Sequence, residues 1–283
     1  MIKIIVDGSA DMPVGWAEKF QFDILPMPIQ IGGTTYYQGE DITPMMFYGI
    51  LSKQSDQSHP QTAAPSPSRI AAFIERVTEL GDTVLSINVS GKMSSTVTMV
   101  EHAAQQLRDK VRVITFDSGA GSAVLALMAR EARMKDAAGA SLEEILDVLK
   151  RIRDQVLVVL TLDNLEFAKR SGRVSALKAA VTSLLKIKPI IALQQGSLEM
   201  SGVVRTRNKA LEQLVSRVKT CFGSQPIRVA VVHSQDPETA EQLKVMLEKT
   251  VRAVETVFTE LSISVAANLG PGTVGVVAIP EKV

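Results

Sequence analysis

The stretch TVLSINVSGKMSSTVTMVEHAAQQLRDK, residues 83–110, holds one complete unit of the fold. Residues 83–89 are a short apolar run typical of a buried strand, and residues 97–110 are typical of a helix. Between them, residues 86–98 carry six hydroxyl side chains in thirteen positions, with one lysine and no carboxylate, histidine or cysteine. The stretch therefore predicts a strand and a helix joined by a loop rich in hydroxyl groups.

The same alternation extends outward on both sides of this unit. A strand is predicted at residues 2–6, ending in DGSAD, and another at residues 111–118, ending in Asp117-Ser118. Helices are predicted at residues 119–139 and at residues 141–155, where Ser141 is followed three positions later by Glu144, as in a capping box. Alternating strands and helices over residues 1–155 predict a parallel sheet with helices on both faces.

The pattern changes after residue 155. A helical stretch over 164–186 is followed by two strands, 188–194 and 198–204, that predict a hairpin around QQGS. Further helices are predicted at 208–222 and 237–250, and further strands at 228–234 and 256–264. We expect an α/β protein of two domains, residues 1–155 and 156–283, in which the second has a mixed or antiparallel sheet and the ligand lies in the cleft between them.

Composition excludes several classes of function. The net charge is +1 and the pI about 7.8, so no strong field is available to attract nucleic acid, and membrane contact is expected to be transient at most. Cys221 is the single cysteine, so the chain forms no internal disulfide and a cytoplasmic location is expected. No uncharged run of membrane-spanning length occurs.

Common catalytic motifs are also missing. The histidines at positions 59, 102 and 233 are not spaced as metal ligands, and the chain contains no GxSxG elbow and no GxxxxGK[ST] loop. The glycine-rich GPGTVG at 270–275 leads into a strand and lacks the spacing of a dinucleotide loop. We therefore expect no metal and no cofactor.

Three loops with hydroxyl groups lie at one predicted edge of the first sheet: residues 7–11, 61–66 and 89–96. Ligands of parallel sheets bind at this edge, and helix N-termini together with hydroxyl groups accept small anions. The alternative is that the serines only cap helices. Two segments of the second domain, SGR at 171–173 and NLGPG at 268–272, add a basic group and tight glycine turns opposite these loops, which favours an anion site.

Several segments in the same order resemble the DegV family of bacterial fatty-acid-binding proteins. The resemblance runs nearly from end to end and lies in KIIVDGSADMP (3–13), QTAAPSP (61–67), LSINVSGKMSSTV (85–97), VITFDSGAGSA (113–123), LDNLEFAKRSGRVSALKAA (162–180), LLKIKPIIAL (184–193), VRTRNKAL (204–211) and NLGPGTVG (268–275). Each segment is weak alone, whereas their order and spacing are specific.

The resemblance implies a carrier that buries one long-chain fatty acid between its domains and performs no chemistry itself. The carboxylate would be bound by Thr62 and Ser94, with Ser95 beside them. Residues implied to lie nearby in the cleft are Ser9, Ser118, Arg173, Arg205, Asn268 and Gly270. Met27, Met93 and Leu125 are candidates for the lining of the tunnel. The family's carriers present the acid to a separate ATP-dependent fatty acid kinase, which makes the acyl phosphate used in phospholipid synthesis.

This chain departs from the family pattern at four places. Gly8-Ser9 stands where two serines are usual, Ser95 where the family has glycine, and Ser171 where it has glycine. Asn268 stands in place of a histidine, and an amide donates a hydrogen bond without carrying a positive charge. Two other hypotheses remain open at this point: an acyl or phosphoryl transfer enzyme with Ser94 or Ser95 as nucleophile, and a lipid-binding or regulatory protein without a kinase.

Overall fold

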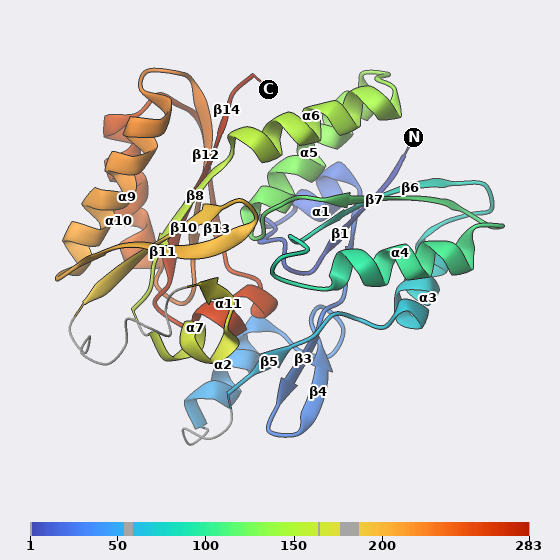
Figure 1. Ribbon diagram of the computed structural model, residues 1–283, viewed down its shortest axis with the longest axis horizontal. Coiled ribbons are helices and arrows are strands. Elements are labelled where there is room, and N and C mark those ends of the chain that lie inside the picture. Colours follow the sequence, from blue (N-terminus) through green and yellow to red (C-terminus); the bar gives the residue numbers. More distant parts are fainter. Residues whose placement is uncertain (1, 54–58, 164, 176–186, 283) are drawn as a thin grey trace.

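Two large β-sheets with helices between and outside them make up most of the molecule (Figure 1). The computed structural model describes residues 2–53, 59–163, 165–175 and 187–282. Within these residues the strands form a four-stranded sheet, a seven-stranded sheet and a small three-stranded sheet. The α/β fold predicted from the sequence is therefore confirmed.

The four-stranded sheet is parallel throughout, in the order β2-β1-β6-β7. Its strands are β1 (Lys3–Asp7), β2 (Phe22–Leu25), β6 (Thr83–Asn88) and β7 (Arg112–Asp117). Side chains alternate between its faces, so Ile5 packs with α3 (Pro67–Val77) and α4 (Thr96–Leu107), while Ile4 packs with α5 (Ala123–Ala137) and α6 (Leu142–Gln155). Both faces are covered by helices, as the unbroken apolar strands predict.

The seven-stranded sheet is mixed and has the order β13-β12-β14-β8-β10-β11-β9. Its strands are β8 (Leu157–Thr161), β9 (Val174–Ser175), β10 (Lys188–Gln194), β11 (Ser197–Val204), β12 (Ile227–His233), β13 (Ala253–Glu260) and β14 (Val274–Pro280). The pairs β12-β13 and β11-β9 are parallel and the remaining pairs are antiparallel. Helices α9 (Arg207–Phe222) and α10 (Pro237–Thr250) cover one face, and α5 and α6 lie between the two large sheets (Figure 1).

The small three-stranded sheet, in the order β4-β3-β5, positions the segment that contains Thr62. Strands β3 (Pro28–Ile31) and β4 (Thr34–Tyr37) form a hairpin, in which Gly32 and Gly33 both have positive φ. Strand β5 (Gln61–Thr62) pairs with β3, placing Thr62 opposite Ile29. The remaining helices are α1 (Trp16–Phe20), α2 (Pro44–Lys53), α7 (Leu165–Ser171) and α11 (Ile263–Leu269).

Two predicted elements are wrong at one end. The strand expected over 256–264 stops at Glu260, because residues from Ile263 onward form α11, which a buried carboxylate caps from the other half of the chain. The helix expected over 164–186 ends at Ser171, because Gly172 takes φ +68° and Val174–Ser175 pairs with β11. The rest of that stretch, 176–186, lies outside the described residues.

No helix in the described parts of the chain has the length and apolar character needed to cross a membrane.

Candidate functional site

A cavity of about 290 Å³ lies between the hydroxyl-bearing loops of the first sheet and the strands of the second. Its apolar lining includes Met27 and Val89 from the first half and Leu160, Leu193 and Val232 from the second. Helix α11 runs along it: Ser264 and Val265 line the cavity, and so do Asn268 and Leu269 one turn later, while Leu261 lines it just before the helix. Met93 lines it too, whereas Leu125 is buried in the core.

One end of the cavity is polar and opens toward the surface. Thr62, Arg173 and Asn268 also line a second, polar pocket with His59, and Ser94, Ser95 and Arg173 line a third with Lys92. Among the described residues that line the main cavity, Arg173 is the only charged one, and it is exposed. The structure thus brings together five of the residues predicted from the sequence: Thr62, Ser94, Ser95, Arg173 and Asn268.

The Thr62 hydroxyl, which lines the cavity, accepts a hydrogen bond from Asn268. The Asn268 amide donates one hydrogen to Thr62 Oγ1 at 3.2 Å and the other to the Ser264 carbonyl at 2.6 Å. Because an amide nitrogen has two hydrogens, Asn268 Nδ2 has none left for a ligand. Thr62 accepts this bond, and among the described residues none accepts a hydrogen bond from its hydroxyl.

Ser94 is fixed by the loop in which it lies. Its backbone N–H donates to the Ser90 carbonyl at 3.0 Å, and its Oγ accepts from the Thr96 N–H at 3.3 Å, at the start of α4. The Thr96 hydroxyl lies 2.8 Å from Ser94 Oγ. Either hydroxyl can be the donor of that bond, and Ser94 keeps its own proton when Thr96 donates. Ser95 is exposed and makes no side-chain capping bond.

Four other hydroxyl groups line the cavity, and each already gives its proton to the protein. Ser9 donates to the Asp7 carboxylate, Ser122 to the Asp11 carboxylate and Ser264 to the Gly8 carbonyl at 3.0 Å. Thr273 donates to the carbonyls of Leu269 and Gly270. An oxygen that has donated its hydrogen can only accept, so these four groups differ from Thr62 and Ser94.

Asp7 and Asp11 are fully buried carboxylates that accept bonds from two of these hydroxyl groups. Asp7 accepts from the Val89 N–H at 2.6 Å and so ties the loop after β1 to the loop that carries Ser94. Asp11 accepts from the Ser262 N–H at 2.7 Å, which caps α11. Burial raises the pKa of both carboxyls, that of Asp11 to about 7. Sequence reasoning missed both roles, because DGSAD has the composition of any turn.

Besides Leu125, three predicted residues do not line the cavity. Ser118 is buried and bonds to Ala120. Arg205 is exposed and directly follows β11, whereas Leu198, at the other end of that strand, lines the cavity. Gly270 ends α11 with φ +85°, and a Cβ there would stand 2.7 Å from the Phe167 ring. The glycines of this turn therefore serve close packing and a left-handed backbone.

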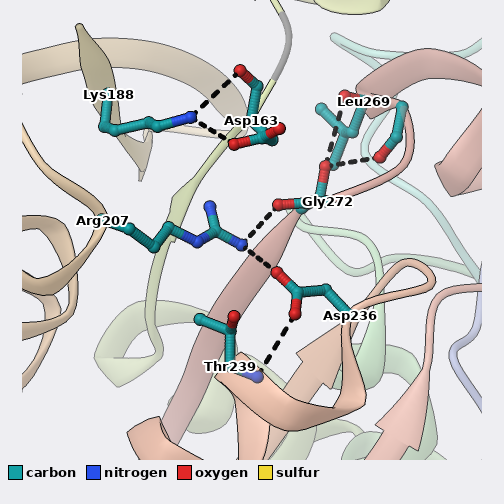
Figure 2. Close-up of polar contacts among 9 residues, drawn as sticks. Asp163, Lys188, Arg207, Asp236, Thr239, Leu269 and Gly272 are labelled. Atoms are coloured by element: carbon teal, nitrogen blue, oxygen red, sulfur yellow. Dashed lines mark hydrogen bonds and ion pairs between the residues drawn. The ribbon is translucent and has the colours of Figure 1, made fainter.

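Arg207 anchors the glycine turn from α9, a role that no motif revealed (Figure 2). Its Nη2 donates to the Gly272 carbonyl at 2.6 Å and to Asp236 at 2.7 Å, while Asp236 caps α10 at Thr239. Lys188 pairs with Asp163 beside them, and a Cβ on Gly272 would stand 2.5 Å from Asp163 Cβ. These contacts fix the turn that follows Asn268.

A family model described as an uncharacterised protein of the DegV family matches residues 1–281. A DegV domain-containing protein of Listeria innocua is 28% identical, with 97% of this chain and 96% of the relative covered. A protein of Thermotoga maritima named fatty acid-binding protein is 29% identical over the same shares.

Solved structures match over nearly the whole chain. A fatty acid-binding DegV family protein from Thermus thermophilus is 30% identical, with a TM-score of 0.88 and 99% of each chain covered. A DegV lipid-binding protein from Thermotoga maritima is 26% identical, with a TM-score of 0.87 and 99% of each chain covered. The predicted family resemblance is confirmed by these matches.

Proposed function

Because this chain belongs to the DegV family, we propose that it binds one long-chain fatty acid, with the carboxylate on Thr62 and Ser94 and the alkyl chain in the cavity. The observation that carries the proposal is the distribution of available protons. Among the described residues, Thr62 and Ser95 give their hydroxyl protons to no protein group, and Ser94 keeps its proton when Thr96 donates to it. All three gather at the polar end of the cavity, while the remainder is mostly aliphatic. A carboxylate needs donors and an alkyl chain needs apolar walls.

Two further features favour an anionic head group at this end. Helix α4 begins at Thr96 directly after the two serines, and the first N–H groups of a helix carry partial positive charge. Arg173 adds a guanidinium that lines the same end of the cavity. Asn268 is neutral and contributes by orienting Thr62.

The alkyl chain supplies most of the affinity. Burial of about 14 methylenes contributes roughly 11 kcal/mol before costs, at about 0.8 kcal/mol each. A hydrogen bond to a charged group adds about 1.5 to 3 kcal/mol, and loss of motion on binding subtracts several kcal/mol. The tail therefore sets affinity and the hydroxyl groups set the direction in which the acid lies.

We further propose a division of labour along the chain. Residues 1–155 would supply the carboxylate donors Thr62 and Ser94, and residues 156–283 would cover the acyl chain with α11 and the seven-stranded sheet. Ser95 and Arg173 are exposed beside the head-group end, so the carboxylate would be reachable from outside. This supports presentation of the acid to a separate ATP-dependent fatty acid kinase.

Mass spectrometry of the gently purified protein under native conditions tests fatty acid binding. We expect an added mass equal to one long-chain fatty acid, lost on denaturation. A protein that carries only a short or polar molecule, and that does not bind hexadecanoic acid in a titration, would contradict the proposal.

The kinase step has its own test. The loaded protein is mixed with ATP, with or without a fatty acid kinase from the same organism, and acyl phosphate is trapped with hydroxylamine. We expect the product only when both proteins are present. Ester turnover by the protein alone that is lost in Ser94→Ala would instead favour a serine-dependent acyl transferase.

A further inference from the structure

Three serine side chains form a continuous polar spot on the otherwise apolar wall of the cavity, which we name the serine wall: Ser9, Ser122 and Ser264. Ser9 and Ser264 are 6% and 5% exposed, so both are shielded from bulk water. The Ser122 N–H donates to the Ser9 carbonyl at 3.1 Å, and Ser264 Oγ donates to the carbonyl of the adjacent Gly8 at 3.0 Å. The three residues are thus joined through one short segment of backbone.

Every hydroxyl proton of the serine wall points into the protein. Ser9 and Ser122 donate to buried carboxylates, and Ser264 donates to a carbonyl. Each oxygen still has acceptor capacity, so the wall offers acceptors and no donor. Two of the three protons are therefore held by acids behind the wall and the third by a backbone carbonyl.

A group bound here must bring its own proton. A carboxylate has no proton to donate and finds no donor here, so its place remains beside Thr62 and Ser94. An unsubstituted alkyl chain would pass the wall without using its acceptors. A hydroxyl group on the chain fits, since its hydrogen would bond to a serine oxygen.

The position of that hydroxyl follows from α11. Ser264 lies one helical turn before Asn268 on the side of α11 that lines the cavity, a rise of about 6 Å. Asn268 contacts Thr62, which marks the carboxyl end. An extended alkyl chain advances about 1.3 Å per carbon, so a chain that runs along α11 from this end would reach the wall at about its fifth carbon. We infer that the serine wall is a subsite for a fatty acid that carries a hydroxyl group near its fifth carbon. This inference rests on the proposed binding of fatty acids.

Calorimetric titration with hexadecanoic acid and with its 5-hydroxy and 15-hydroxy derivatives tests the inference. The two derivatives carry the same polar group, so their difference reports its position. We expect the 5-hydroxy acid to bind about threefold to tenfold more tightly than the 15-hydroxy acid, the worth of one hydrogen bond. In Ser264→Ala the ratio should fall below about twofold, whereas Ser234→Ala, a buried serine outside the lining, should keep it.

Equal affinities for the two derivatives in the unaltered protein would overturn the inference without any variant, provided that hexadecanoic acid binds. A ratio unchanged in Ser264→Ala would also overturn it. If hexadecanoic acid itself does not bind, the proposed function fails and the subsite fails with it, so the two failures are distinguishable.

Discussion

The head-group end and the serine wall are two regions of one cavity, built from the same kinds of side chain with opposite chemistry. At the head-group end Thr62 accepts a bond from Asn268 and keeps its proton. On the serine wall Ser9 gives its proton to Asp7. The comparison teaches that a hydroxyl group in a binding site is defined by its partners in the protein, which decide whether it donates to a ligand or only accepts.

The largest effect should come from blocking the apolar lining beside these two regions. Val265→Trp places an indole on the cavity-lining side of α11, where it would exclude several methylenes of the ligand. We expect affinity for hexadecanoic acid to fall about 100-fold or more, because each buried methylene contributes about 0.8 kcal/mol. The control is Val245→Trp, at an exposed position of α10 outside this cavity. When both variants are titrated with hexadecanoic acid, the control should keep normal affinity.

The head-group end is tested by removing the hydroxyl groups of Thr62 and Ser94. Thr62→Val and Ser94→Ala should each weaken binding of the acid about tenfold to 100-fold, the worth of a hydrogen bond to a charged group. The methyl ester of the same acid carries no charge, so its weaker binding should change much less. Equal losses for acid and ester, measured by displacement of a fluorescent fatty acid, would place the carboxylate elsewhere.

The carboxylates behind the serine wall predict a pH dependence of stability. The pKa of Asp11 is raised from 3.8 to about 7 by burial, so between these values the folded protein binds more protons than the unfolded chain. The contribution of Asp11 to the free energy of unfolding is therefore largest at low pH. It falls as the pH rises toward 7, by up to about 1.4 kcal/mol per pH unit.

Urea unfolding at several pH values between 5 and 8 measures this slope. Asp11→Asn should flatten it, since the amide does not titrate. Glu144→Gln is the comparison variant, because Glu144 lies in an exposed capping box where the pKa is lowered. A slope that persists unchanged in Asp11→Asn would show that the decline arises at other groups.

The smallest effect on binding should come from the serine wall itself. Ser9→Ala removes a proton that goes to Asp7, so affinity for hexadecanoic acid should change less than about twofold. The free energy of unfolding should fall by about 1 to 3 kcal/mol, because the buried Asp7 carboxylate loses a donor. A loss of affinity as large as that of Ser94→Ala would show that the two regions contribute equally to binding the acid.

Much of this arrangement followed from local patterns. The apolar strands around 83–89 and 111–118 and the capping box at Ser141 indicated covered parallel strands and their helices, since these features depend on neighbours in sequence. The same patterns failed at 261–264, where TVFTELSIS predicts a strand but Asp11 caps the start of a helix. They also failed after Gly172, where pairing with β11 overrides helical spacing.

The sequence by itself determined which loops carry hydroxyl groups and that these loops meet at one sheet edge, because strand and helix periodicity is a local property. Only the tertiary structure decided where each proton goes. Asp11 and Ser122 are 111 positions apart, and Asn268 and Thr62 are 206 apart. A hydroxyl group rotates to the nearest acceptor, and here that acceptor comes from a distant part of the chain, which no local pattern can specify.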